Sequence, residues 1–282
     1  MRSILPHLRH STSEECLDTE TKTQKVDNYV TKVISELQPV EGTVAETYLK
    51  KTRKLSRLPR NSSLKFHPEL NVRTTGGDWI SGVPALVAVS GHPRSNNNNI
   101  QITYLDFKTG DKHPQVPVAK RTFGSFRGHP TGHHFCELMR NLRKTYSFVC
   151  EGVETALSVH QVFPDNHLIA TLGRNNLTFP ISISFINVLL ISGKHNFLKL
   201  DPAVVNEKVV IILDNDGVKI RHDKVFNTTA KKLLAAGKKV FFVVPPLVDG
   251  LTKTDMNDVL LHHGLEAVND VITKEMKKIT LK

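Results

Sequence analysis

The second half of the chain alternates between short apolar segments and amphipathic segments, and this alternation constrains the fold more than any other feature. The apolar segments are predicted strands, at 146–150, 167–172, 208–213 and 239–244. The amphipathic segments are predicted helices, at 155–163, 223–236, 255–263 and 265–277. Gly237 is placed to cap the second helix at its C-terminus. Strands that alternate with helices form parallel sheets with helices on their faces. We therefore expect an α/β domain over residues 145–282.

The first half of the chain has a different pattern. Residues 1–24 are predicted to be a polar tail, and residues 26–37 have apolar side chains at helical spacing. A capping-box pattern from Thr43 to Glu46 predicts a second short helix. From residue 64 to residue 123, apolar segments separated by turn residues predict an antiparallel meander. We therefore expect an N-terminal α+β region over residues 25–135, ending in a Gly- and His-rich loop at 124–134.

Acidic residues follow the predicted strands or open a predicted helix. The first group is Glu151 and Glu154, the second is Asp214 and Asp216, and the third is Asp255 and Asp258. In open α/β sheets, ligands bind outside the carboxyl ends of the strands. We therefore expect Glu151 to lie close to Asp214 and Asp216.

The Asp214-Asn-Asp216 spacing is suited to a hard cation. Side chains two residues apart on an extended segment point the same way, so both carboxylates can share one ion. Mg²⁺ prefers oxygen ligands and often binds one or two carboxylates together with substrate phosphates. The competing interpretation is that such residues cap helices and form turns, and this applies most directly to Asp255.

Several motifs together resemble a known family. The run from Val149 to Leu157 (VCEGVETAL), the run Ile212–Gly217 (ILDNDG) and the run Asp255–Leu260 (DMNDVL) are similar to the Toprim domain of plasmid- and phage-type primases. The same form occurs near the ends of conjugative relaxases of the TraI type. The upstream segments 40–49, 64–68 and 83–87 are similar to the region that precedes Toprim in those proteins. The resemblance covers roughly residues 40–263.

The resemblance implies a four-stranded parallel sheet flanked by helices, with Glu151 as general acid or base. It implies Mg²⁺ or Mn²⁺ on Asp214 and Asp216, with Glu151 beside the ion. The further acidic candidates are Glu154, Asp255 and Asp258. The implied activity is primase-like nucleotidyl transfer on single-stranded DNA with nucleotides, in the bacterial cytoplasm. The chain is then a free-standing enzyme or a fragment of a plasmid mobilisation protein, with partners in a replication or conjugation complex.

The sequence departs from that family at several points. Neither a zinc-binding module nor a Walker A motif is present in the sequence. The segment 174–207 is longer than the link that usually joins the second and third strands in that family. Two alternatives to priming therefore stay open: a non-catalytic DNA-binding accessory module of a relaxase, and a Toprim nuclease.

The balance of charge favours a polyanionic partner. The chain has 38 Lys and Arg against 27 Asp and Glu, a net charge of +11. Solubility is the competing explanation for this excess. The candidate nucleic-acid contacts are basic residues before the meander and at its last strand: Lys50, Lys51, Arg53, Lys54, Lys120 and Arg121. For the first four, a solvated helix face is the competing interpretation. His129, His133 and His134 lack acidic or Cys neighbours and are not expected to bind metal.

The three cysteines form no C-x-x-C pair, which argues against a zinc ribbon and for a reducing cytosol. The N-terminal residues contain no apolar signal-peptide core. The longest apolar run, 181–191, is too short and too polar to span a bilayer, so we expect no membrane association.

Overall fold

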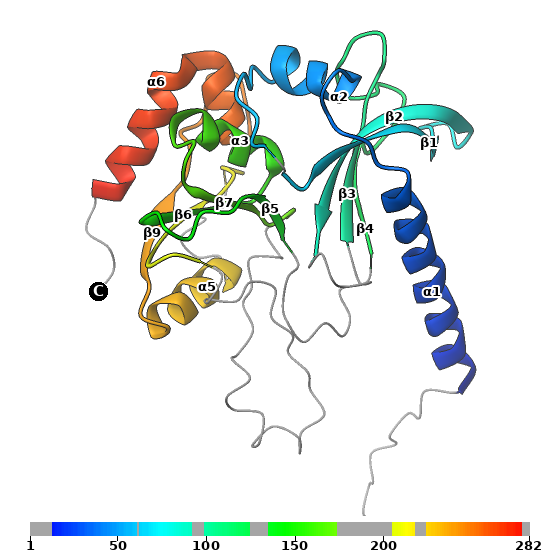
Figure 1. Cartoon of the computed structure of the whole chain (residues 1–282), viewed down its shortest axis with the longest axis horizontal. Helices are drawn as coiled ribbons and strands as arrows, with labels where there is room; N and C mark the ends of the chain where they lie inside the picture. The colour runs from blue at the N-terminus through cyan, green and yellow to red at the C-terminus, as the bar shows by residue number, and fades with distance from the viewer. Residues whose placement is uncertain are drawn as a thin grey trace, which may run out of the picture.

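The computed structural model describes residues 13–60, 62–91, 99–124, 135–173, 205–217 and 224–277. For residues 13–23 and 224–226 it describes the backbone alone. The backbone forms two sheets (Figure 1). We call them the N-terminal sheet and the C-terminal sheet.

The N-terminal sheet is the predicted antiparallel meander. Its strands are β1 (Leu64–Arg73), β2 (Trp79–Ser90), β3 (Asn99–Tyr104) and β4 (Lys120–Phe123), in the order β1-β2-β3-β4. All three pairings are antiparallel. The sheet is covered on both faces, because alternate residues of β2 belong to two different buried clusters.

Helix α1 (Ser13–Ser35) runs beside the N-terminal sheet (Figure 1). Its residues Val30 and Val33 are buried against one face of the sheet. The helix begins at Ser13, so the second half of the predicted polar tail is helical. The physical reason is that helix-favouring Glu, Lys and Gln residues need no apolar face to continue a helix that is docked at its other end.

Helix α2 (Val44–Thr47) begins where the capping pattern predicted it. The Thr43 hydroxyl accepts a hydrogen bond from the Ala45 N–H at 3.2 Å. The Glu46 carboxylate accepts one from the Gly42 N–H at 2.8 Å, one residue earlier than in the usual capping box. A turn of π-helix, Tyr48–Thr52, follows directly and buries Tyr48.

The C-terminal sheet has five strands. They are β5 (Cys136–Met139), β6 (Tyr146–Cys150), β7 (His167–Ala170), β8 (Lys208–Ile212) and β9 (Lys239–Val243). Their order is β5-β7-β6-β8-β9, and β7, β6, β8 and β9 are parallel, as predicted. The edge strand β5 was not predicted and runs antiparallel to β7.

Helices cover both faces of the C-terminal sheet (Figure 1). They are α3 (Val153–Val162), α5 (Lys224–Ala235) and α6 (Met256–Lys277). Helices α3 and α6 pack on one face and α5 on the other. The predicted break between two C-terminal helices is confirmed as a kink at Gly264 in α6. The predicted C-cap of α5 is confirmed at Gly237, whose φ is +75° and whose N–H donates to the Leu234 carbonyl.

The two sheets share one hydrophobic core. Its buried members come from α2 and the π-turn, from β1 and β2, and from β6, α3 and α6. Residues 125–134, with His129, His133 and His134, and residues 174–204, with the apolar run 181–191, lie outside the described residues. Within the described part of the chain, no helix is long and apolar enough to cross a membrane.

Candidate active site

The carboxyl ends of β6 and β8 bring two predicted acidic residues together. These strands are parallel neighbours in register, with Cys150 opposite Ile212. Glu151 follows β6 directly, and its N–H donates to the Ile212 carbonyl at 3.3 Å. Asp214 follows β8 by one further residue. The predicted proximity of Glu151 and Asp214 thus results from the strand order of the sheet.

Asp214 interacts electrostatically with the other acidic residues of this edge. Burial raises the pKa of its carboxyl to about 7, and the negative charges of Glu151 and Asp255 act in the same direction. The Thr155 hydroxyl, at the start of α3, donates to Asp214 Oδ1 at 3.2 Å. Three carboxylates from three separate segments therefore converge at this edge.

The loop after Asp214 is tied to the segment before α6. Asn215 and Thr254 exchange two backbone hydrogen bonds, of 2.7 and 2.9 Å. Asp216 is partly buried, and its Oδ1 atom lies 3.7 Å from Lys253 Nζ. This bridge brings Asp255, which directly follows Thr254, to the acidic edge.

The third acidic group caps α6. The Asp255 N–H donates to Asp258 Oδ2, and the Asp258 N–H donates to Asp255 Oδ1, each at 2.9 Å. This reciprocal pair is a capping box, so the capping interpretation is confirmed for Asp255. Burial raises the pKa of Asp255, with the nearby Asp258 charge acting in the same direction. Asp255 thus caps a helix and also adds charge at the candidate site.

The chemistry of these side chains fits a hard divalent cation. All are carboxylates. Burial and then repulsion from Glu151 and Asp255 raise the pKa of Asp214, and a cation would relieve that repulsion. Among the described residues, no three His, Cys, Asp or Glu side chains form a ready metal cluster. Mg²⁺ commonly takes one or two protein carboxylates and completes its shell with water and phosphate. The chemistry of Asp214 and its neighbouring carboxylates is compatible with such an ion.

Glu154 has a different environment from the other acidic residues. It is buried, its Oε1 atom accepts from the Tyr48 hydroxyl at 2.8 Å, and its Oε2 atom accepts from Lys120 Nζ at 2.6 Å. Burial alone would raise the pKa of Glu154, but Lys120, Lys112 and the Tyr48 hydroxyl together hold it well below its usual range. Glu154 therefore joins α3 to the N-terminal sheet.

A basic cluster lies around Glu154. Its members are Arg53, Lys112 and Lys120, which all interact electrostatically with Glu154, and Lys112 also interacts with the other two. Burial lowers the pKa of Lys112, while the Glu154 charge acts the other way. Lys112 was not predicted, because it follows a turn and carries no motif. The Asp255 charge also acts on Lys112, so this cluster borders the acidic edge.

The predicted basic contacts do not form one surface. Arg53 donates from Nε to the Tyr48 hydroxyl at 3.0 Å, and Lys50 pairs with Glu46 at 2.6 Å. Lys51 is exposed, and Lys54 donates to the Leu261 carbonyl at 3.4 Å. Arg121 lies on the face of the N-terminal sheet opposite to that of Lys120, and its guanidinium carbon is 5.9 Å from the Tyr104 ring centroid. Contact of any of these residues with nucleic acid stays a prediction.

The chain resembles one protein family over part of its length and several solved structures. Residues 24–132 match a family model described as a domain of unknown function, DUF7146. No curated protein matches the chain. The chain is similar to the Aquifex aeolicus primase structure that contains zinc-binding and RNA polymerase domains. The identity is 17% and the TM-score 0.50, over 91% of this chain and 62% of that one.

Two further primase structures are similar at lower scores. The DnaG primase catalytic domain bound to ssDNA matches at 15% identity and a TM-score of 0.46, over 92% of this chain and 82% of that one. The primase fragment of the bacteriophage T7 primase-helicase matches at 15% identity and a TM-score of 0.37, over 69% and 66%. The chain spans less than two thirds of the Aquifex structure. At this identity the comparison shows the fold: a mixed α/β architecture with a Toprim-like sheet, as in primases.

Proposed function

We propose that this chain is a primase-like protein that transfers nucleotidyl groups on single-stranded DNA with Mg²⁺ or Mn²⁺. One observation supports this most directly: Glu151, Asp214 and Asp255 converge beside the cluster of Arg53, Lys112 and Lys120. An acidic edge that suits a cation and a basic cluster that suits phosphates are the two parts that phosphoryl transfer needs.

The residues have separate roles in this proposal. Asp214 and Asp216 hold the cation, and Glu151 lies beside it. When bound, the cation neutralises charge on the transferring phosphoryl group. The attacking hydroxyl forms a bond to the α-phosphate of the incoming NTP, and pyrophosphate leaves. Glu151, which directly follows β6 and whose charge acts on Asp214, accepts the proton of that hydroxyl. The basic cluster orients the triphosphate through its positive charge.

The setting of the protein is part of the same proposal. The resemblance of residues 149–157 and 212–217 to plasmid-type primases and TraI-type relaxases supports a bacterial cytoplasmic protein. It also supports membership of a replication or conjugation complex, as a free-standing enzyme or as a fragment of a mobilisation protein. Both the free-standing enzyme and the fragment of a mobilisation protein are inferred from the sequence alone.

The experiment is a primer-synthesis assay with the full chain. The chain is incubated with single-stranded DNA, labelled NTPs and Mg²⁺ or Mn²⁺, and products are resolved on a denaturing gel. We expect oligonucleotide products that vanish with Glu151→Gln and with Asp214→Asn. Matched controls are Glu266→Gln and Asp270→Asn, because these side chains are exposed on α6. Products at wild-type level in both site variants would overturn the proposal.

The same gel separates the two other functions. Shortening of end-labelled DNA without NTPs, lost in Glu151→Gln, would identify a Toprim nuclease. DNA binding with neither synthesis nor cleavage would identify an accessory module.

A further inference from the structure

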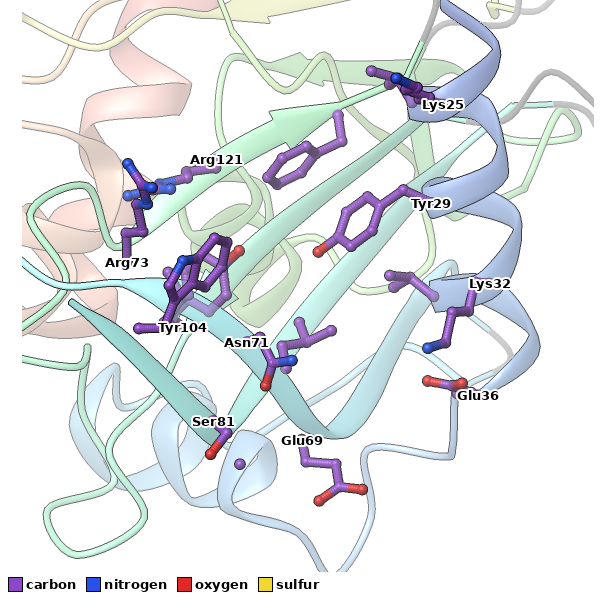
Figure 2. A pocket seen from close by; sticks show the side chains of 17 residues that line it. Lys25, Tyr29, Lys32, Glu36, Glu69, Asn71, Arg73, Ser81, Tyr104 and Arg121 are labelled. Atoms are coloured by element: carbon purple, nitrogen blue, oxygen red, sulfur yellow. The ribbon is translucent and has the colours of Figure 1, made fainter. Parts of the chain in front are cut away.

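A large groove lies between α1 and the N-terminal sheet (Figure 2). Its volume is about 1030 Å³, and residues of α1 and of all four strands line it. This is at the upper end of the range for small-ligand pockets. The groove is therefore large enough for an extended ligand.

Two arginine–aromatic pairs lie in the wall of this groove, and of their two rings Trp79 is exposed whereas Tyr104 is buried. Arg73 lies 5.4 Å from the Trp79 ring centroid, and Arg121 lies 5.9 Å from the Tyr104 ring centroid. Trp79 is the sole tryptophan of the chain, and 67% of its surface is exposed. An exposed tryptophan beside an arginine has little value for the core and is well suited to stacking on a planar ligand.

Charge divides the groove into two ends. Figure 2 shows Arg73 and Arg121 near Tyr104, and Glu36 with Glu69 at the far side. The arginine end attracts a polyanion, whereas at the other end Lys32 lies beside Glu36 (Figure 2). Lys25 and Lys32 of α1 add positive charge on the helical wall.

Strand β4 connects the groove with the acidic edge. It is an edge strand of its sheet, and its side chains alternate between the two faces. Lys120 points to Glu154 on the side of the acidic site, whereas Arg121 and Phe123 line the groove beside Tyr104. Lys120 also acts through its charge on Asp214, so β4 has the groove on one side and a neighbour of the acidic site on the other.

We infer that this groove binds single-stranded nucleic acid, with bases stacked on Trp79 and phosphates paired with Arg73 and Arg121. Stacking platforms interleaved with cations are how proteins hold single strands without reading their sequence. The inference rests on the proposed function only in making this strand the template. Binding itself needs neither the cation nor nucleotides.

The test is a binding titration of the full chain in EDTA without NTPs, followed in two ways. Anisotropy of a labelled oligo-dT of about 16 nucleotides measures affinity. Fluorescence of the sole tryptophan reports contact at Trp79 itself, and we expect quenching that saturates with the anisotropy signal. Binding without any change in Trp79 fluorescence would overturn the inference.

Variants define the groove further. We expect Trp79→Ala to weaken binding by about 5- to 100-fold and Trp79→Phe by less, since Phe keeps a stacking face. Arg73→Ala and Arg121→Ala are each expected to reduce the slope of log K against log salt by about 1. Lys274→Ala removes the same charge from an exposed position on α6 and should leave the affinity unchanged. Wild-type affinity in Trp79→Ala would overturn the inference.

Two further arms complete the design. A duplex of the same sequence is expected to bind at least 10-fold more weakly, because its bases are not free to stack; equal binding of the duplex would overturn the inference. Oligo-rU in place of oligo-dT tells whether the strand is RNA or DNA, and stacking on Trp79 with either supports the site. Failure of primer synthesis with intact groove binding overturns the proposed function and leaves this inference standing.

Discussion

The Lys120 ammonium lies 2.6 Å from the Glu154 carboxylate, and this ion pair joins the N-terminal sheet to the first helix of the Toprim-like sheet. Only 6% of the Glu154 side chain and 31% of the Lys120 side chain are exposed. The Tyr48 hydroxyl completes the environment of the carboxylate. Lys112 interacts electrostatically with both members of this pair and with Asp255, so the pair borders the acidic edge.

Removing one partner of this ion pair should destabilise the whole chain. Lys120→Met leaves the Glu154 charge buried without its nearest counterion, for which we expect a loss of about 3–5 kcal/mol. Urea unfolding at pH 7 measures it. Lys50→Met breaks a pair whose lysine is 45% exposed and should lose at most about 1 kcal/mol. Similar losses in both variants would contradict the structure.

Acid should weaken the same contact. The pKa of Glu154 is held below its ordinary value in the folded state, so the pair contributes stability above the unfolded pKa. That contribution is lost as the pH falls through the range between the unfolded and folded pKa values. In Glu154→Gln, the urea midpoint should fall less steeply below pH 4.5 than in the wild type. Parallel pH profiles would count against the assignment.

Asp214 should have the opposite pH dependence. Its folded pKa, about 7, lies above the ordinary value of 3.8, so the protonated form is favoured by folding. Stability from this group is present at low pH and is lost as the pH rises from about 4 to about 7. In EDTA, Asp214→Asn should match the wild type at pH 4. At pH 8 it should be more stable by up to about 4 kcal/mol.

Thermal melts at both pH values measure this difference, and Mg²⁺ at pH 8 separates a metal site from a merely buried acid. Mg²⁺ should raise the Tm of the wild type and not that of Asp214→Asn. The exposed Asp270→Asn variant should behave as the wild type at both pH values. An Asp214→Asn protein that is less stable at pH 8 would show that the carboxylate is stabilising, contrary to its environment.

Local pattern was sufficient to predict most of the C-terminal sheet. β6 and β8 are short and mostly apolar, and β9 ends at Val243, two residues before Pro245. Strand β5 was not predicted because its four residues include the charged Glu137, and its partner among the described strands, β7, begins about thirty residues later. Pairing at such distance is a tertiary effect that periodicity does not report.

Some residues of the candidate site could be predicted from the sequence, and others could not. Glu151 and Asp214 were predictable because residues that follow neighbouring parallel strands meet at one edge. Tyr48 and Lys112 were not, because they reach the site from the N-terminal sheet and its preceding π-turn. Glu154 belongs to the same motif as Glu151, yet it lies in the first turn of α3 and pairs with Lys120 of the other sheet. A motif alone does not separate these two carboxylates.

Ser147, His167 and Glu137 form a chain that resembles a nucleophile, a base and its orienting acid. In the tautomer with a proton on Nε2, His167 accepts from Ser147 Oγ and donates to Glu137 Oε1, both at 3.0 Å. Ser147 and His167 are fully buried, and the Ser147 hydroxyl also accepts the Asn206 N–H at 2.8 Å. The chain is therefore structural, and it lies at the amino ends of β6 and β7.

Ser147→Ala should affect stability and leave activity intact. It leaves the Asn206 N–H without its acceptor, which costs about 1–3 kcal/mol. We expect a lower urea midpoint, an unchanged rate of primer synthesis per folded molecule, and no labelling of the wild type by a fluorophosphonate. Labelling at Ser147 would contradict the structural role.

Gly264 fixes the kink in α6 through its backbone angles. Its φ of +81° and ψ of −175° fall in a region that only glycine occupies readily. An added Cβ would meet no atom within 4 Å, so Gly264→Ala isolates the backbone cost, which we expect to be about 1–3 kcal/mol. Gly76→Ala is the matched control, because its neighbours lie at 3.7 and 3.8 Å and its φ is not positive. Urea unfolding should separate the two variants by at least about 1 kcal/mol. Equal urea midpoints for the two variants would mean that α6 does not need the backbone angles of Gly264 and can continue without a kink.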